Sequence, residues 1–343
     1  RDLDTQLNLN EKLNRRINSL KGKEKGLAYR DIKKGWKEIR RIENQIRDDI
    51  LDRIQVVCCT CIGAGNEILD GRRFPQVLID EATQATEPAS LVPLTRGARQ
   101  VVLVGDHKQL PPTVISFRAE EKGLKRSLFE RLVDLGIEPL LLSTQYRMHP
   151  AISKFPNQHF YSDKLDDGIK SENRPAPAGL IWPDWENPVA FVPVEGGEVV
   201  SPDGTSRENP SEVSWVIKIL NDILEAGEIT KKDIGIITPY AGQVRAIRNS
   251  MNEKLDDVEV KTVDGYQGRE KEVIIFSCVR SNPEQNVGFL SEKRRLNVAL
   301  TRAKRGLIVI GDPATLRGDD NWRAWLEYVR DRKFEAWHLL GMN

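Results

Sequence analysis

The chain has 343 residues, 39% hydrophobic and 30% charged, which is the composition of a globular protein long enough for two domains. Lys and Arg number 52 against 51 Asp and Glu, and this net charge of +1 excludes a uniformly basic nucleic-acid binder, so any basic surface must be local. No stretch approaches the ~18 consecutive apolar residues of a membrane-spanning helix, and the charged N-terminus lacks the apolar core of a signal peptide.

The first 53 residues differ from the rest of the chain. Apolar residues recur at spacings of three and four from Trp36 to Ile54, which indicates one face of a helix. The residues that predict an earlier helix are Leu13, Ile17 and Leu20, and the run 21–26 predicts the turn between the two. We interpret the segment as a helical hairpin with one apolar stripe. A solvated coiled-coil-like arm and a surface that contacts nucleic acid both stay open as its role.

Three of the four cysteines stand close together, at Cys58, Cys59 and Cys61. They contain the C-x-x-C spacing of redox and zinc sites, but no second Cys/His pair stands at ligand spacing. The preceding run from Ile54 to Val57 predicts a buried strand. We therefore interpret these cysteines as structural thiols in a reducing compartment.

From residue 54 onward, apolar β-branched runs alternate with helical patterns in two successive blocks. Near-continuous Val/Ile/Leu runs predict strands covered on both faces, hence an α/β fold with parallel sheets. The predicted strands are 54–59, 76–80, 100–105, 139–143, 188–193, 234–238, 258–262, 273–279 and 307–311. Residues 172–210 predict mostly loop around one strand, and Asn209-Pro210-Ser211-Glu212 predicts the start of a helix.

The first chemical motif is the acidic pair that ends the strand at 76–80. Carboxylates at this point lie at the carboxyl edge of a sheet, where α/β proteins bind ligands. We expect Asp80 to hold Mg²⁺ through water, and Glu81 to orient or deprotonate an attacking water. Taken alone, the pair is equally compatible with solvated acids at the start of a loop.

Two further motifs follow strand ends. Gln109 comes just after the strand at 100–105, and its neutral amide is suited to sense a γ-phosphate or the attacking water. His107 is expected to be packed or solvent-facing rather than a metal ligand. Arg147 opens the second α/β block and is a candidate arginine finger, a group worth roughly 10³–10⁵ in rate. The neighbouring Tyr146 offers a flat face for a base, although an ordinary structural ion pair would explain Arg147 if it stood alone.

The last two motifs lie in the second block. Residues 262–270 combine two glycines with short polar side chains after a strand, which allows close approach to a phosphate backbone. The basic helix at 294–303 carries Arg302, a second candidate for a phosphate clamp. Each motif is moderate evidence, but their order, each at a strand end and divided between two blocks, is strong.

At these residues the chain resembles superfamily 1B helicases, in the branch of the nonsense-mediated-decay RNA helicases, with senataxin and the immunoglobulin-mu-binding helicase as relatives. The resemblance runs from about Val56 to Pro313. It rests on the motifs at 58–65, 80–88, 105–110, 127–132, 145–150, 235–240, 263–270 and 296–303. Ala82 and the pair Pro111-Pro112 depart from the nearest branch, and the proline pair is closer to senataxin and the immunoglobulin-mu-binding helicase.

The resemblance implies two RecA-like domains that clamp ATP and Mg²⁺ while single-stranded RNA or DNA lies across both. The implied divisions are a helical stalk at 1–53, the C-terminal part of a first RecA-like domain at 54–138, a second RecA-like domain at 139–321 and a helical tail at 322–343. The implied roles are catalysis by Glu81, Gln109, Arg147 and Arg302, nucleotide contacts from Asp80, Tyr146, Gly268 and Glu270, and nucleic-acid contacts from Thr60, Pro239 and Thr262. The stalk would carry an accessory β-barrel.

No G-x-x-x-x-G-K-[ST] phosphate loop occurs in these residues, and the chain begins with Arg1. We therefore expect a part of a longer protein, inactive alone, that belongs to an ATP-dependent 5′→3′ RNA or DNA translocase of RNA quality control. The alternative is an inactive nucleic-acid-binding module or scaffold. A small GTPase or kinase is a poor third interpretation, because N-K-x-D, H-R-D and D-F-G motifs do not occur in the sequence. We expect regulatory protein partners, no membrane partner, and a cytoplasmic location with the nucleus as a second one.

Overall fold

The computed structural model describes residues 2–252 and 255–340. They divide between Ala64 and Gly65 into two compact units, which are described separately. Among the described residues, no helix is both long enough and apolar enough to cross a membrane.

The first unit is built on a helical hairpin, as predicted. Helix α1 (Asp2–Arg16) packs against α2 (Gly22–Arg53) through a small cluster that includes Ile17 and Ile32. The turn is earlier than expected, because the charged residues after Gly22 already belong to α2. The apolar stripe is only partly covered, since Ile39 is 1% exposed but Trp36 is 47% exposed.

A polar contact fixes how closely the two helices approach. Asn10 is buried in α1, and its Nδ2 donates to the carbonyl oxygen of Ile32, 3.3 Å away. Gly35 makes room for this side chain, because a Cβ there would lie 2.1 Å from Asn10 Oδ1. The small residue therefore determines the spacing of the hairpin.

The strand predicted at 54–59 is wrong. The chain forms no strand there, Val56 is 72% exposed, and Cys58 and Cys59 are exposed while Cys61 is partly buried. A strand needs a neighbouring edge to satisfy its N–H and C=O groups. No described strand provides one here, so the apolar composition does not lead to burial.

The second unit contains a five-stranded parallel sheet in the order β5-β11-β10-β8-β9. Its strands are β5 (Val189–Pro193), β8 (Ile234–Thr238), β9 (Glu259–Thr262), β10 (Lys271–Ser277) and β11 (Ala303–Gly311). Each of these matches a predicted strand within a few residues. Near-continuous apolar runs formed them because both faces of the sheet are covered.

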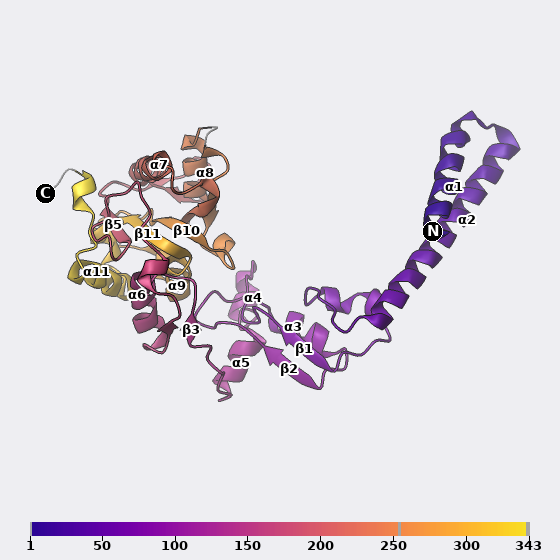
Figure 1. The fold of residues 1–343 in the computed structure, drawn as a ribbon, viewed down its shortest axis with the longest axis horizontal. Coiled ribbons are helices and arrows are strands. Elements are labelled where there is room, and N and C mark those ends of the chain that lie inside the picture. Colours follow the sequence, from indigo (N-terminus) through magenta and orange to yellow (C-terminus); the bar gives the residue numbers. More distant parts are fainter. Residues whose placement is uncertain (1, 253–254, 341–343) are drawn as a thin grey trace. The chain divides into compact units, whose positions relative to one another are not determined.

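Successive residues of β10 and β11 enter different cores. In β11, Val309 joins the core under α6 (Pro150–Tyr161), α9 (Lys293–Leu300) and α11 (Asp320–Asp331), whereas Ile308 joins the core under α7 (Pro210–Glu225) and α8 (Ala241–Ser250). Figure 1 shows these two groups of helices on either side of the sheet. The predicted α/β fold with parallel sheets is confirmed.

A two-stranded parallel sheet precedes it, made of β1 (Gln76–Ile79) and β2 (Gln100–Leu103). The strand predicted at 139–143 is wrong: the segment is extended but unpaired, and Leu140 is 98% exposed. Leu78 in β1 is also 65% exposed, so the apolar residues of this strand are not buried on both faces of the two-stranded sheet.

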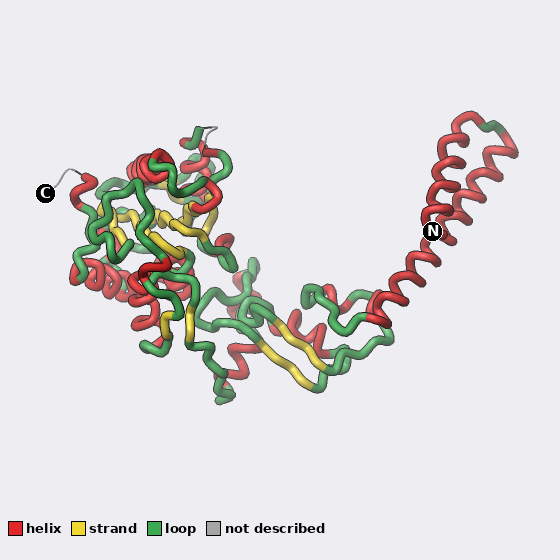
Figure 2. Tube along the Cα trace, in the orientation of Figure 1, coloured by secondary structure: helices red, strands yellow, loops and turns green. Residues whose placement is uncertain are grey.

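The remaining elements are short, and loops connect them (Figure 2). They are α3 (Glu87–Leu94), α4 (Phe117–Glu121), α5 (Leu128–Asp134), β3 (Thr144–Gln145), β4 (Asp166–Asp167), β6 (Val199–Val200), β7 (Arg207–Glu208) and α10 (Pro313–Leu316). The region 172–210 is mostly loop, as predicted, although it adds the β6–β7 hairpin to the one expected strand. The predicted start of α7 is confirmed, since the Asn209 side chain accepts bonds from the amides of Ser211 and Glu212.

Candidate functional site

The acidic pair and the Gln109 loop lie at one edge of the first sheet. β1 and β2 are parallel, so their carboxyl ends, and the loops after them, emerge at the same edge. Glu81 has a left-handed φ of 51°, and its Oε2 accepts a 2.6 Å bond from Gln84 Nε2. A left-handed conformation in a residue other than glycine stores strain of the kind found at functional sites. The two loops approach closely because Gly105 lacks a Cβ, which would lie 3.0 Å from the amide nitrogen of Thr83.

Asp106 organises the second of these loops. Its carboxylate accepts bonds from the Lys108 amide at 2.9 Å, from Gln109 Nε2 at 2.9 Å and from the hydroxyl of Tyr161 at 2.5 Å. Burial first, and the charge of Asp106 second, raise the pKa of Tyr161, so this phenol stays a donor at neutral pH. Within the second compact unit, the elements around the two-stranded β1–β2 sheet form a first α/β part, and the five-stranded sheet with its helices forms a second. Tyr161 ends α6, and the bond therefore ties the Gln109 loop to the second α/β part.

Asn297 makes a second tie between the two parts. From α9, its Nδ2 donates to the Lys108 carbonyl and to the Tyr161 hydroxyl, both at 2.9 Å. Sequence reasoning missed both Tyr161 and Asn297. No motif includes Tyr161, and in the basic helix at 294–303 the predicted site residue was Arg302 rather than Asn297.

Arg302 lies between the two parts and is 2% exposed. Its Nη2 donates to Gln109 Oε1 at 3.2 Å and to Thr301 Oγ1 at 2.9 Å, and its Nε donates to the Val298 carbonyl at 3.1 Å. Burial, and then repulsion from Arg147, lower the pKa of Arg302 to about 10, against the opposing influence of anionic groups that include Glu81 and Glu270. The guanidinium is therefore charged at neutral pH and lies within electrostatic reach of both arginine and carboxylate neighbours.

Arg147 is oriented by two contacts. Its Nε donates to Glu270 Oε2 at 2.5 Å, and its Nη1 donates to the Thr301 carbonyl at 3.1 Å. Burial raises the pKa of Glu270, but bonds from Arg147 and Lys304 outweigh it and leave the pKa below its ordinary value. Glu270 is thus an anion that holds two cations in place.

Two other predicted residues flank this pair. Tyr146 is 66% exposed and lies against Gly168, where a Cβ would be 2.3 Å from the Tyr146 ring. The exposed ring is available to a flat ligand. Gly268 has a left-handed φ of 74° and open space beside it.

The structure therefore brings Gln109, Arg302, Arg147 and Glu270 together, with Glu81 in electrostatic reach. Asp80 is adjacent and accepts the Glu81 amide at 2.9 Å. Pro239 follows β8 and Thr262 ends β9, so both lie at the carboxyl edge of the large sheet rather than in this cluster. Thr60 belongs to the other compact unit, and its hydroxyl accepts the Gly63 amide at 3.0 Å.

The cluster has the chemistry of a site for an anionic group. Two guanidinium groups and an amide lie in this cluster, with Arg302 in electrostatic reach of Glu81, and such donors suit the terminal phosphate of a nucleotide. The Asp80 carboxylate supplies the oxygen ligand that Mg²⁺ prefers, directly or through water. The residues present thus fit the terminal phosphate of a nucleotide and would supply one carboxylate, Asp80, toward its metal ion.

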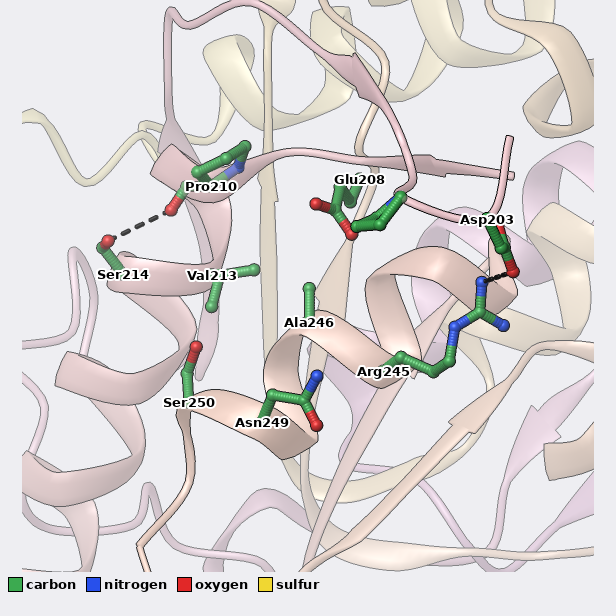
Figure 3. A pocket seen from close by; sticks show the side chains of 10 residues that line it. Asp203, Glu208, Pro210, Val213, Ser214, Arg245, Ala246, Asn249 and Ser250 are labelled. Carbon is green, nitrogen blue, oxygen red and sulfur yellow. Dashed lines mark hydrogen bonds and ion pairs between the residues drawn. The ribbon is translucent and has the colours of Figure 1, made fainter. Parts of the chain in front are cut away.

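A separate cavity of about 560 Å³ lies between α7, α8 and the β6–β7 hairpin (Figure 3). Its lining includes Glu208, Pro210 and the ion pair of Asp203 with Arg245. None of the predicted site residues lines it, so it takes no part in the cluster.

Comparison with known proteins shows the family to which the chain belongs. The AAA domain family matches residues 124–314, more than half of the chain, and a second AAA domain family matches residues 3–117. The chain belongs to the AAA domain family. The resemblance to superfamily 1 helicases of the nonsense-transcript branch is also confirmed, by the relatives that follow.

The regulator of nonsense transcripts 1 homolog of Drosophila melanogaster is 45% identical over 304 residues, covering 87% of this chain and 26% of that protein. The ATP-dependent helicase NAM7 of Saccharomyces cerevisiae is 44% identical over 314 residues, covering 89% of this chain and 32% of that protein. This AAA-domain chain therefore spans about a quarter to a third of the length of the curated relatives it matches. The solved structure of an arterivirus nonstructural protein 10 helicase with DNA aligns at 16% identity with a TM-score of 0.36, covering 71% of this chain and 41% of that one.

Proposed function

We propose that this chain forms part of the motor of an ATP-dependent helicase that acts in RNA quality control of the nonsense-mediated-decay type. One observation carries the proposal: Arg302, from the second α/β part, donates directly to Gln109, from the first. A nucleotide bound at this point would be sensed by both parts at once. Similarity to the regulator of nonsense transcripts and to an ATP-dependent helicase supports the same conclusion.

The contacts suggest a role for each side chain. Glu81 orients or deprotonates the attacking water, and Gln84 holds its carboxylate through the 2.6 Å bond. Gln109 and Arg302 together sense the γ-phosphate, and Arg147 neutralises the charge that develops on it. Bound Mg²⁺, held through Asp80, would offset further phosphate charge. Tyr146 stacks on the base, while Gly268 and Glu270 line the same site.

Hydrolysis at this point would be tied to movement along a strand. We propose translocation 5′→3′ on single-stranded RNA, with DNA as a second substrate, through contacts mainly to phosphate and sugar. Thr60, Pro239 and Thr262 are the proposed backbone contacts. We also propose the cytoplasm, and secondarily the nucleus, as the location.

The test is Glu81→Gln in the complete protein, with nucleic-acid-stimulated ATP hydrolysis as the measurement. Because a positioned base contributes at least about 10²-fold to rate, we expect turnover to fall by that factor or more. Glu121→Gln, an exposed carboxylate of α4, serves as the matched control and should retain full activity. Near-normal turnover of Glu81→Gln would reject the role given to Glu81.

A second candidate function is a binding module or scaffold without turnover. It is favoured by the absence of a G-x-x-x-x-G-K-[ST] phosphate loop from these 343 residues. Binding of a fluorescent ATP analogue to this polypeptide separates the two, and we expect weak or undetectable affinity. Micromolar binding would contradict that expectation and favour a complete nucleotide site.

A further inference from the structure

Phe289 is an aromatic side chain held in an exposed position. It lies in a short 3₁₀ turn (Gly288–Ser291) between β10 and α9, and it is 59% exposed while the next residue, Leu290, is 4% exposed. Exposing a large aromatic ring forgoes the stabilisation that burial would give. An aromatic residue fixed in this state is therefore a candidate contact for a ligand with a flat face.

The turn that carries Phe289 is held in place by contacts with Tyr240. The Phe289 amide donates to the hydroxyl of the buried Tyr240 at 3.3 Å, and the two rings lie 5.4 Å apart at 40°. The same hydroxyl accepts a 3.3 Å bond from Arg280 Nη1. Tyr240 follows β8, so these contacts place the ring at the carboxyl edge of the large sheet.

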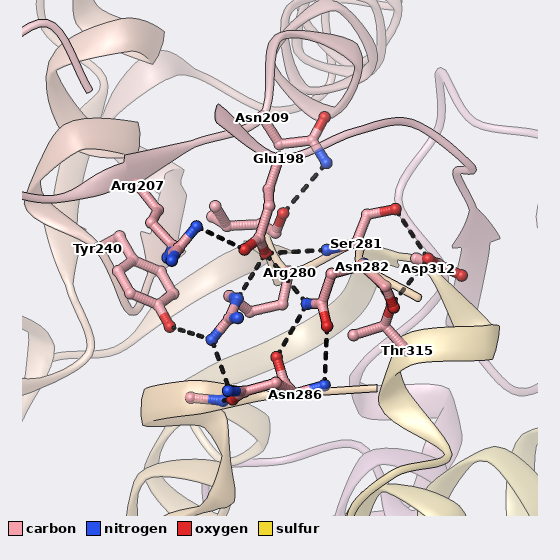
Figure 4. A network of polar contacts seen from close by, with 12 residues as sticks. Glu198, Arg207, Asn209, Tyr240, Arg280, Ser281, Asn282, Asn286, Asp312 and Thr315 are labelled. Atoms are coloured by element: carbon pink, nitrogen blue, oxygen red, sulfur yellow. Dashed lines mark hydrogen bonds and ion pairs between the residues drawn. The ribbon is translucent and has the colours of Figure 1, made fainter. Parts of the chain in front are cut away.

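Arg280 is in turn part of a dense polar network, shown in Figure 4. Its Nε pairs with the buried Glu198 at 2.5 Å, and Glu198 also accepts from Arg207 and from the Ser281 amide. Gly288 completes the fit, because it has a φ of 53° and a Cβ there would lie 2.1 Å from Arg280 Nη1. A side chain at 288 would displace the turn, so the position of Phe289 is built into the fold.

A cation lies beside the ring. The guanidinium of Arg295, on α9, is 5.5 Å from the Phe289 ring centre, and its Nε and Nη2 bind Asp264 at 3.1 and 3.3 Å. Its Nη1 has no bonding partner among the residues that the structure describes. An arginine oriented by a carboxylate in this way keeps donors for a second anion.

Arg295 and Asp264 also line a cavity of about 230 Å³, together with Gln84 and Gln267. The side-chain Nε2 of Gln267 is buried without a hydrogen-bond partner among the described residues. A buried donor of this kind is costly unless a ligand or water satisfies it. The surface next to Phe289 therefore offers a ring and a cation, beside a cavity whose lining includes Gln267.

We propose that Phe289 stacks on a base of single-stranded nucleic acid while Arg295 and the adjoining cavity receive the neighbouring phosphate and sugar. This inference rests on the proposed function and adds a contact to the bases, where the motifs supply contacts to the backbone. Aromatic stacking is tolerant of sequence because every base has a flat face, and the Arg295 guanidinium beside the ring can donate to a phosphate through the nitrogen that Asp264 leaves unbonded. Ribose and deoxyribose strands share this chemistry.

The experiment measures the affinity of this chain for four fluorescent twelve-nucleotide strands by anisotropy. They are oligo(U), oligo(dT), and the same two backbones with every base removed. The protein variants are wild type, Phe289→Ala, Phe289→Trp as the conservative replacement, and Trp185→Ala as the matched control. Trp185 is likewise exposed, at 54%, but it precedes the amino end of β5 and so lies at the opposite edge of the sheet.

We expect Phe289→Ala to weaken binding of the strands with bases about tenfold and to leave the abasic strands unchanged. Phe289→Trp should restore the difference, and Trp185→Ala should bind as wild type does. If Phe289→Ala weakens binding equally on strands with and without bases, Phe289 has a structural role. If it weakens binding on neither, Phe289 is not part of the interface. Both results overturn the inference while leaving the proposed function intact. Failure of the wild-type chain to bind any strand would reject the nucleic-acid interaction itself, and the inference with it. A preference of wild type for oligo(U) or oligo(dT) distinguishes the two sources of the strand.

Discussion

Replacing Glu212 by Gln should remove a large part of the dependence of stability on pH. Glu212 lies in the first turn of α7 and is fully buried. Its carboxyl oxygens accept the Val279 amide at 2.8 and 2.9 Å and the Ser277 hydroxyl at 2.6 Å. Burial nevertheless dominates and raises the pKa of Glu212 from 4.5 to about 8.

The sign and size of the effect follow from proton binding. Between pH 4.5 and 8 the folded protein holds a proton on Glu212 that the unfolded chain releases, so the free energy of unfolding falls as pH rises. At about 1.4 kcal/mol per pH unit, the interval between the two pKa values corresponds to roughly 5 kcal/mol. The loss is complete above pH 8.

The assay is urea unfolding at pH values from 5 to 8.5, followed by the fluorescence of Trp322 and Trp325, which are buried in the large core. Glu212→Gln should match wild type near pH 5 and exceed it by several kcal/mol near pH 8. Burial lowers the pKa of His107 and His149, which acts in the opposite direction but equally in both proteins. The difference between the two curves therefore isolates Glu212, and parallel curves would refute the reasoning.

Three further substitutions test packing and the tie between the two parts. Gly35→Ala should destabilise the α1–α2 hairpin by about 1 kcal/mol or more, because its Cβ would lie 2.1 Å from Asn10 Oδ1. Gly26→Ala, in open space on the same helix, should instead stabilise the hairpin by about 0.5–1 kcal/mol. Circular dichroism melts of the two variants check this, and equal shifts would contradict it. Tyr161→Phe should cost about 1–2 kcal/mol, because Asp106 loses its 2.5 Å donor, and a urea midpoint unchanged from wild type would count against that bond.

The pattern of strands was largely predictable because it depends on local sequence. β-branched runs such as those of β8 and β11 formed strands where a partner edge and covering helices were present. The capping sequence at Asn209 started α7 as predicted, since a cap needs only neighbouring residues. Gln109 and Arg302, which the motifs had assigned to the same phosphate, also meet, although only Gln109 follows the carboxyl end of a strand, whereas Arg302 directly precedes the amino end of β11.

The errors concern features that depend on distant partners. Residues 54–59 and 139–143 have strand-like composition, but no described edge pairs with them, so they form no strand and are mostly exposed. Tyr161 reaches Asp106 across 55 positions of the chain, and Asn297 reaches Lys108 across 189. No local pattern predicts such pairs, because their geometry exists only after both α/β parts have folded.

The electrostatics of Arg302 strengthen the assignment of an anion site. A buried charge is normally paired with an opposite one, yet the partners of this guanidinium are the neutral oxygens of Val298, Thr301 and Gln109. Its pKa of about 10 keeps it charged at neutral pH beside Arg147, whose own carboxylate partner is Glu270. Two cations held together, one of them without a bonded carboxylate among the described residues, gain most from a ligand that brings negative charge. A phosphate placed between Gln109 and the two arginines would satisfy both, which is why the cluster is better explained by nucleotide binding than by stability alone.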